Sequence, residues 1–199
     1  PIDPVRFIGN RSSGKMGYSI AKAALNLGAD VTLVSGPTQL SLQHKNLNLI
    51  RVETAQQMFE ASKLAFKEAD VAIFSAAVSD YSPKEIANQK IKKTENLSIE
   101  LEKTNDILKF CGQQKRENQL VIGFALESNN EEEYAKGKLV SKNADFIVLN
   151  SLNDKNATFG YDTNKVTVFG TNNIVKGFEL MTKEKLAKEL LGYFEDFLK

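Results

Sequence analysis

The spacing of apolar residues along this chain switches repeatedly between a helical period and short continuous runs. Between residues 13 and 27 the apolar positions, among them Ile20 and Leu25, share one helical face, and Gly28 is expected to end the helix. The continuous apolar run 71–74 is typical of a strand buried on both faces. The same patterns predict strands at 31–34, 48–52, 97–101, 120–124 and 146–149, and helices over 54–68, from 106, over 131–142 and from 183. This alternation indicates an α/β fold, with a doubly wound, mainly parallel sheet flanked by helices.

The last part of the chain has a different pattern. Two β-rich runs, 165–169 and 174–178, flank the turn residues 170–173 and predict a C-terminal β-hairpin before the final helix. No repeat, low-complexity tract or linker divides the sequence. Residues 1–199 are therefore predicted to form a single domain.

Composition narrows the class of protein. The 199 residues are 42% hydrophobic, enough to bury a substantial core, and the net charge of +1 gives no reason to expect a nucleic-acid partner. Cys111 and His44 are the only residues of their types, so an internal disulfide or a metal site built from His and Cys is excluded. No apolar run approaches the ~20 residues of a membrane helix, and residues 1–4 do not resemble a signal peptide. We expect a soluble, cytoplasmic protein, and the initial Pro1 suggests a piece of a longer chain or a processed one.

Ligands of parallel sheets bind beyond the carboxyl ends of the strands, so polar segments near such ends are the first candidates for a site. Residues 9–17 are rich in glycine and hydroxyl groups and run into a helix, where backbone amides could hold a phosphate. The glycines and Lys15 have the spacing of a P-loop, but Met16 stands where that motif needs a serine or threonine for magnesium. The P-loop is therefore rejected. An ordinary helix cap by Ser12 or Ser13 is an equal alternative to phosphate binding.

Two further polar segments follow predicted strands. In the segment 76–80, small residues would let a base or phosphate approach the backbone, and Asp80 could accept from a hydroxyl or bind magnesium, although aspartate is also a common turn former. Residues 90–93 carry three lysines. They lie within a loop of about 18 residues, longer than most connections, which favours a lid that brings a lysine to a triphosphate. The alternative is a plain solvated face.

The helix predicted at 131–142 carries two competing patterns. Lys138 and Lys142 lie four residues apart on one face and could present two ammonium groups to one anion, although helical lysines are more often plain surface residues. Tyr134 and Lys138 match the Tyr-x-x-x-Lys pair of short-chain dehydrogenases, but residues 120–123 lack the serine that this chemistry needs. An NAD(P)-dependent reductase is therefore one alternative function, and a non-catalytic nucleotide-binding module is another.

Taken in order, these segments resemble phosphopantothenoylcysteine synthetase, the ligase domain often fused behind a phosphopantothenoylcysteine decarboxylase in bacteria. The resemblance covers nearly the whole chain and is most specific at residues 3–8, 10–17, 76–81 and 90–93, and at Gly123 and Phe124 with Glu127, Asn129 and Asn130. It implies a Rossmann-like fold and a reaction in two steps. The carboxylate of 4'-phosphopantothenate attacks the α-phosphate of CTP, with Mg²⁺, to give an acyl-cytidylate and pyrophosphate. The amine of cysteine then displaces CMP.

The resemblance also implies roles for residues at matching positions. Asn10 corresponds to the residue that handles the acyl-cytidylate, Lys90 to the one that steadies the triphosphate, and Arg6 to a group that meets phosphopantothenate. The matching nucleotide-binding positions are Phe74, Ser75, Ala76, Asp80, Lys90, Asn105, Asp106, Ile107, Leu108, Phe124, Lys138 and Lys142. No magnesium ligands follow from the resemblance.

Two departures from the family pattern qualify this expectation. Asn105 stands where the family usually has proline, so that turn lacks a rigid residue. The family's first strand and its glycine-rich turn would precede Pro1, and we expect that strand in the native protein because its neighbours would otherwise stay unpaired. Family members act as dimers, and the hairpin at 165–178 is expected to be the dimerisation arm.

Overall fold

The structure is a computed structural model that describes residues 1–92, 96–154, 157 and 160–198. Lys93, part of the predicted lysine segment, lies outside these residues. The helices are α1 (Lys15–Asn26), α2 (Ala55–Phe66), α3 (Ile107–Gln114), α4 (Glu131–Ser141) and α5 (Lys183–Glu195). The strands are β1 (Val31–Ser35), β2 (Leu47–Arg51), β3 (Val71–Phe74), β4 (Tyr81–Pro83), β5 (Leu101–Lys103), β6 (Leu120–Glu127), β7 (Phe146–Ser151), β8 (Thr163–Gly170) and β9 (Ile174–Thr182).

The main sheet has five strands in the order β3-β6-β7-β8-β9. The first three strands run parallel, and β8 and β9 complete the sheet in antiparallel orientation. The predicted α/β fold is therefore confirmed, with a mixed sheet. The predicted hairpin is β8–β9, and it is built into this sheet because β8 pairs with β7 as well as with β9. Its role as a dimerisation arm stays a prediction.

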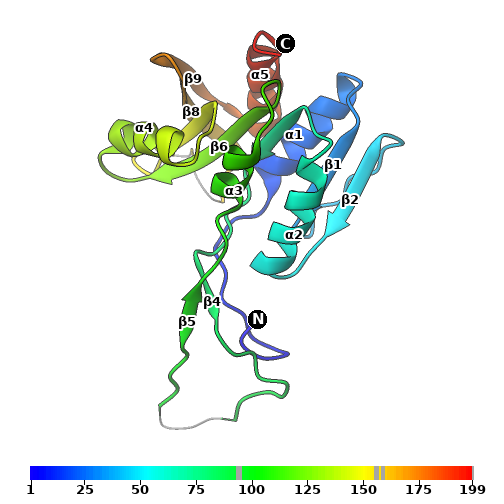
Figure 1. The fold of residues 1–199 in the computed structure, drawn as a ribbon, viewed down its shortest axis with the longest axis vertical. Helices are drawn as coiled ribbons and strands as arrows, with labels where there is room; N and C mark the ends of the chain where they lie inside the picture. Colours follow the sequence, from blue (N-terminus) through cyan, green and yellow to red (C-terminus); the bar gives the residue numbers. More distant parts are fainter. Residues whose placement is uncertain (93–95, 155–156, 158–159, 199) are drawn as a thin grey trace.

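Helices cover both faces of the main sheet (Figure 1). On one face α3 and α4 pack over the sheet, and Cys111 joins Ile147 in a fully buried cluster. On the other face α5 places Leu186 and Leu190 against Val148, and α1 packs beside α5. Complete burial of one such side chain contributes roughly 1.5–3 kcal/mol. The apolar layers on the two faces of the sheet thus hold the strands in place, together with the helix ends that lie at the carboxyl edge of the sheet.

Local signals in the sequence set several helix ends. Thr54 and Gln57 form a reciprocal capping box at the start of α2. The Asp106 side chain accepts from the Lys109 amide at the start of α3. Gly28, with a φ of 89°, ends α1 in the left-handed region that glycine adopts without strain. The ends predicted at Thr54, Asp106 and Gly28 are therefore confirmed.

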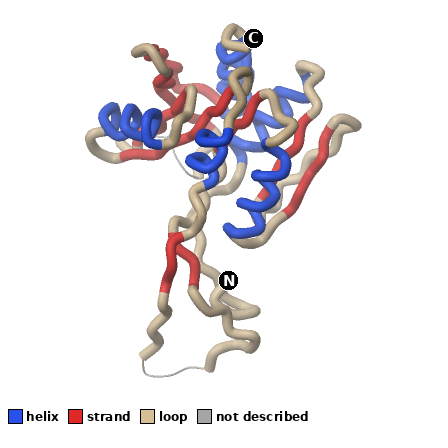
Figure 2. Tube along the Cα trace, viewed as in Figure 1, coloured by secondary structure: helices blue, strands red, loops and turns tan. Residues whose placement is uncertain are grey.

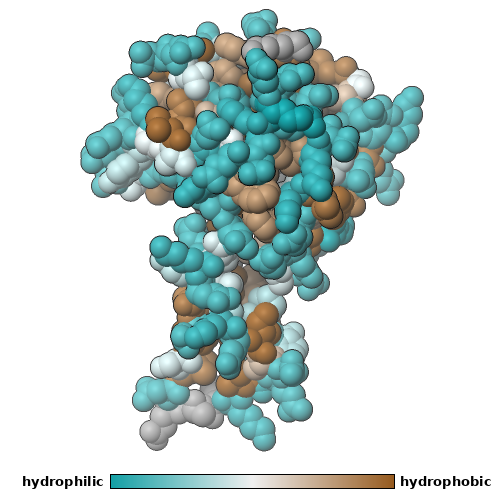
Figure 3. Space-filling model, in the orientation of Figure 1, coloured by the Kyte–Doolittle hydropathy of each residue, from teal (hydrophilic) through white to brown (hydrophobic). Residues whose placement is uncertain are grey.

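A stalk of residues 1–9 and 81–103, within the described part of the chain, extends away from the sheet (Figures 1 and 2). The predicted strand at 97–101 is corrected here, because the observed strand is β5, which pairs antiparallel with β4 and stays outside the main sheet. The stalk exposes many apolar side chains (Figure 3), including Val5, Phe7 and Leu97. Little of its own hydrophobic surface is buried within this chain.

The sheet is interrupted between β1 and β3. β1 pairs with β2 and β3 pairs with β6, but these two units share no strand pairing in the described residues. The additional upstream strand stays a prediction, with which this interruption is compatible. Among the described residues, no helix has the length and apolar character needed to cross a bilayer.

Candidate active site at the carboxyl edge of the sheet

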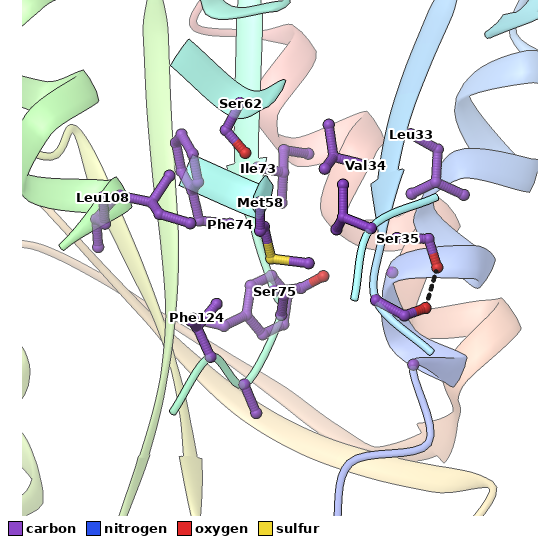
Figure 4. Close-up of a pocket in the computed structure, with 18 of the residues that line it drawn as sticks. Leu33, Val34, Ser35, Met58, Ser62, Ile73, Phe74, Ser75, Leu108 and Phe124 are labelled. Atoms are coloured by element: carbon purple, nitrogen blue, oxygen red, sulfur yellow. Dashed lines mark hydrogen bonds between the residues drawn. The ribbon is translucent and has the colours of Figure 1, made fainter. Parts of the chain in front are cut away.

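The carboxyl ends of β3 and β6 open onto a large cleft, the position at which a parallel sheet holds its ligand. Figure 4 shows Phe74, Ser75, Leu108 and Phe124 around this cleft, with residues 33–35 of β1 on the opposite side. A Cβ atom at Gly123 would lie 2.4 Å from Leu108 Cδ2, so a larger residue there would displace the Leu108 side chain from its place against β6. The structure therefore brings together four of the predicted nucleotide-binding segments, at 74–76, 80, 105–108 and 124.

Two of these segments are joined by hydrogen bonds. Thr104 donates from its side chain to the Ser79 carbonyl at 2.7 Å and from its amide to the Asp80 carbonyl at 3.0 Å. Asn105 donates from Nδ2 to Gln56 Oε1 of α2 at 2.9 Å. A side-chain hydrogen bond thus restrains the turn in which the family usually has proline. Asp80 and Asn105 both line the cleft.

The two lysines of α4 bind separate carboxylates. Lys138 donates to Glu127 at 2.5 Å, and Lys142 donates to Asp106. Burial alone would raise the pKa of Asp106, but hydrogen bonds from the Lys142 ammonium and the Lys109 amide, together with the charges of these lysines, lower it below its ordinary value. Both lysines line the cleft, yet they are not arranged around one common anion as their helical spacing suggested.

The glycine-rich segment places the N-terminus of α1 at the same edge. Gly14, with a φ of 80°, is the N-cap, so neither Ser12 nor Ser13 occupies the cap position that was the alternative to phosphate binding, although their Oγ atoms accept long hydrogen bonds from the amides of Gly14 at 3.5 Å and Lys15 at 3.4 Å. A Cβ atom at Gly17 would lie 3.0 Å from Ser75 Oγ, which shows how closely α1 approaches the end of β3. The first-turn amides that follow Lys15 have no partner within the helix and could donate to an anion.

Asn10 also belongs to this edge. Its Nδ2 donates to the Ala77 carbonyl, and its Oδ1 accepts from the Ser12 amide at 3.1 Å. The side chain is exposed and lines the cleft, so both hydrogen bonds can be exchanged for bonds to a ligand. The predicted catalytic asparagine therefore lies beside the segment that follows β3.

Arg6 and Lys90 lie in the stalk, outside the cleft of their own chain. The Arg6 guanidinium is held by Asp3, and its Nη2 also donates to the Ile91 carbonyl at 3.1 Å. Asp3, only 2% exposed, accepts from the amides of Val5, Arg6 and Ile91. The Arg6 hydrogen bond is the main reason why the pKa of Asp3 lies far below its usual range. Asp3 thus ties the turn that carries Arg6 to the loop that carries the exposed Lys90.

The described residues support neither a reactive cysteine nor a metal site with three or more protein ligands. Burial raises the pKa of the Cys111 thiol to about 11, so the thiol stays protonated at neutral pH. No group of three or more His, Cys, Asp or Glu side chains in the described part of the chain could enclose a metal ion.

Several polar cleft residues were not predicted from the sequence, and among them are Asn150, Asn164 and Lys183. Asn150 follows the predicted strand 146–149, and the strand-end rule could have found it. Asn164 and Lys183 flank the hairpin, and nothing in the local pattern links them to the cleft. Only the order in which the strands pair places Asn164 and Lys183 at the carboxyl edge of the sheet.

A family model described as "DNA/pantothenate metabolism flavoprotein C-terminal domain" matches residues 1–197. The chain belongs to this family. The crystal structure of the C-terminal domain of coenzyme A biosynthesis bifunctional protein CoaBC is 46% identical to it, with a TM-score of 0.82, and the match covers 98% of this chain and 88% of that one. The family resemblance and the Rossmann-like fold expected from the sequence are thereby confirmed.

Curated relatives of this C-terminal-domain family carry different names. A protein named "Cysteine/Cysteine sulfinic acid decarboxylase", from an unknown prokaryotic organism, is 47% identical over 192 residues, which are 96% of this chain and 54% of that protein. The coenzyme A biosynthesis bifunctional protein CoaBC of Bacillus subtilis (strain 168) is 42% identical over 191 residues, which are 96% of this chain and 47% of that protein. The chain spans about half the length of the curated relatives it matches. The reductase alternative gains no support from these comparisons.

Proposed function

We propose that this domain is a ligase that joins 4'-phosphopantothenate and L-cysteine into 4'-phosphopantothenoylcysteine, a step of coenzyme A biosynthesis, with CTP as the activating nucleotide. The observation that carries the proposal is the convergence of Asn10, residues 74–80 and residues 105–108 on one cleft. The 46% identity to the CoaBC C-terminal domain supports the same assignment.

In the first step a carboxylate oxygen of 4'-phosphopantothenate attacks the α-phosphorus of CTP. The new O–P bond forms as the bond to the β-phosphate oxygen breaks, and pyrophosphate leaves. We assign the nucleotide to the cleft residues Ser75, Asp80 and Asn105, with the N-terminus of α1 facing its phosphates. Lys90 supplies positive charge to the triphosphate, where negative charge is redistributed as pyrophosphate departs.

In the second step the amine nitrogen of cysteine attacks the acyl carbon of the acyl-cytidylate. The C–N bond forms, CMP leaves with the electrons of the acyl–oxygen bond, and the amine loses a proton. Asn10 has neither an acidic nor a basic side chain. We therefore assign it to hydrogen bonding of the acyl-cytidylate, by exchange of its bond to the Ala77 carbonyl.

Magnesium fits this site as an ion carried mainly by the nucleotide. Asp80 is a carboxylate at the cleft that can join such an ion, and the described residues hold no cluster of three acidic, His or Cys groups that would bind it alone. Bound Mg²⁺ would neutralise phosphate charge. The cytoplasmic location and an attached decarboxylase domain also remain part of this proposal.

We propose a homodimer in which the stalk of one protomer serves the cleft of the other. The support is that Arg6 and Lys90 lie outside the cleft of their own chain, while the stalk exposes Phe7 at 75% and Val5 at 63%. Exposed apolar groups of this kind mark interaction surfaces. Mixing two inactive variants, Lys90→Gln and Asn10→Asp, tests the arrangement. Mixed dimers should regain activity at one of their two sites, whereas complete inactivity of the mixture would exclude a shared site.

The function itself is tested by pyrophosphate release from CTP and Mg²⁺ in the full-length protein. Release should require 4'-phosphopantothenate and fall strongly in Lys90→Gln. Asn10→Asp should release pyrophosphate and accumulate the acyl-cytidylate without forming product. A control, Lys188→Gln, changes an exposed lysine of α5 far from the cleft and should behave like the wild type. No release with CTP or ATP would refute the ligase assignment.

A further inference from the structure

Asn150, Asn164 and Lys183 are brought together by strand register. Asn150 pairs with Val166 of β8, and Asn164 lies two residues before Val166, so both asparagines face the same side of the sheet. Lys183 is not part of this strand ladder: it is the first residue of α5 and follows Thr182, which pairs with Thr163, the neighbour of Asn164. The chain therefore brings Lys183 to the same edge of the sheet, and all three side chains line the cleft.

Asn164 has a hydrogen-bonding capacity that the chain does not use. Its side chain is 1% exposed and lines the cleft. Nδ2 donates to Asn150 Oδ1 at 3.5 Å, a long bond, and Oδ1 has no partner among the described residues. Buried amide oxygens are nearly always paired, because burial removes the water that would otherwise bind them. The carbonyl of Asn164 is thus an acceptor that a ligand with an N–H or O–H group can satisfy.

Lys183 adds a buried positive charge beside this acceptor. It is 9% exposed, and its Nζ donates to the Tyr161 carbonyl, which leaves donor capacity on the ammonium. Burial lowers the pKa of Lys183. The charge of the nearby Asp162 carboxylate, which is ion-paired with Lys15, acts in the opposite direction. Lys183 is also the first residue of α5, where the helix dipole favours an anion. This part of the cleft therefore offers a cationic corner next to an unpaired acceptor.

We propose that Asn164 and Lys183 form the subsite for the amino-acid substrate, with the amino group on Asn164 Oδ1 and the carboxylate on Lys183. The assignment rests on the proposed ligase function. An α-amino acid carries a donor and an anion on one carbon atom, which matches the two groups. A phosphate is rich in acceptors and would leave the Asn164 acceptor unpaired. Phe124 packs in the apolar cluster on the face of α5, whereas Ile107 and Leu108 of α3 pack in the cluster on the other face.

The proposal is tested in the full-length protein by separating the two half-reactions. Asn164→Leu keeps the shape and removes the unpaired acceptor, so the melting temperature should not fall. The KM for cysteine should rise about tenfold or more, as expected for the loss of one hydrogen bond to a charged group. Pyrophosphate release without cysteine should stay within about twofold of the wild type, as it should in the exposed control Asn118→Leu.

Lys183→Met tests the carboxylate contact with a second nucleophile. Cysteamine lacks the carboxylate of cysteine, so the variant should lose kcat/KM with cysteine and keep it with cysteamine. Lys188→Met, on the exposed side of the same helix, is the matched control. Equal losses with both nucleophiles, or loss of cysteine-independent pyrophosphate release, would overturn the subsite and point to nucleotide binding. A wild-type protein that releases no pyrophosphate would instead refute the ligase function itself.

Discussion

The main sheet and the stalk of this protein are stabilised by opposite means. In the sheet, Val121, Ile122 and Ile147 are fully buried, and helices cover both faces. In the stalk, Phe7 is 75% exposed, and the carboxylate of Asp3 is buried. The sheet therefore owes its shape mainly to hydrophobic packing, whereas the stalk is held by hydrogen bonds, those around the Asp3 carboxylate and those between β4 and β5. The two regions should respond differently to the same kind of substitution.

The largest effect is expected in the sheet domain, for Gly112→Ala. A Cβ atom at Gly112 would lie 1.9 Å from the carbonyl oxygen of Lys142, which belongs to the backbone and cannot rotate away. We expect a loss of about 3 kcal/mol in the free energy of unfolding, measured by urea denaturation. Gly137→Ala is the matched control, because nothing lies within 4 Å of its added atom. Equal stability of the two variants would contradict this packing.

A smaller effect, on activity rather than on stability, is expected for Asp3→Asn. The variant loses the charge that holds the Arg6 guanidinium and the Ile91 amide, so the loop that carries Lys90 loses its position. We expect kcat/KM for pyrophosphate release to fall about tenfold or more, with little change in Tm, since misplacement of a catalytic group is costly. Asp196→Asn, near the C-terminus, is the control. A large fall in Tm would show that the stalk stabilises the sheet domain.

The Asp3 carboxylate should make the structure of the stalk depend on pH. The pKa of Asp3 is depressed in the folded protein, chiefly by Arg6, so its stabilising contribution is complete above its ordinary pKa of about 4 and is lost as pH falls through the folded value. The amide NMR signals of Arg6 and Ile91 should therefore stay in place from neutral pH down to about pH 4 and shift only below it. In Asp3→Asn this transition should be absent. A transition near pH 6 in the wild type would exclude Asp3 as its source.

The smallest effect is expected for Phe7→Ser in the stalk. Because this ring is 75% exposed, its removal should change the unfolding free energy of the isolated chain by less than about 0.5 kcal/mol. Leu186→Ala, at a fully buried position under the sheet, should cost about 3 kcal/mol. Analytical ultracentrifugation over a range of protein concentrations measures dimer dissociation separately from the unfolding free energy. A dimer that dissociates in Phe7→Ser would identify the stalk as its contact, and an unchanged dimer would argue against it.

The sequence predicted what local patterns determine. The helix starts at Thr54 and Asp106 and the apolar strand β3 each follow from neighbouring residues, although β3 is half-buried and not buried on both faces as predicted. β4 was missed because three residues ending in Pro83 carry too short a pattern. The separate ion pairs of Lys138 and Lys142 were missed because Glu127 and Asp106 lie on other elements. The unpaired oxygen of Asn164 likewise becomes visible only once strand register is known.

In the part of the chain that the structure describes, the interruption between β1 and β3 gives the cleft two sides that no strand pairing joins. Helices link them instead, through contacts of α1 with α5 and of α2 with α3. Side-chain packing is more readily rearranged than a ladder of backbone hydrogen bonds, so the width of the cleft in the described residues depends on these helix contacts. Ser75 lies on one side of the cleft and Ser35 on the other, so the distance that a ligand between them can span is set by residues that do not touch it.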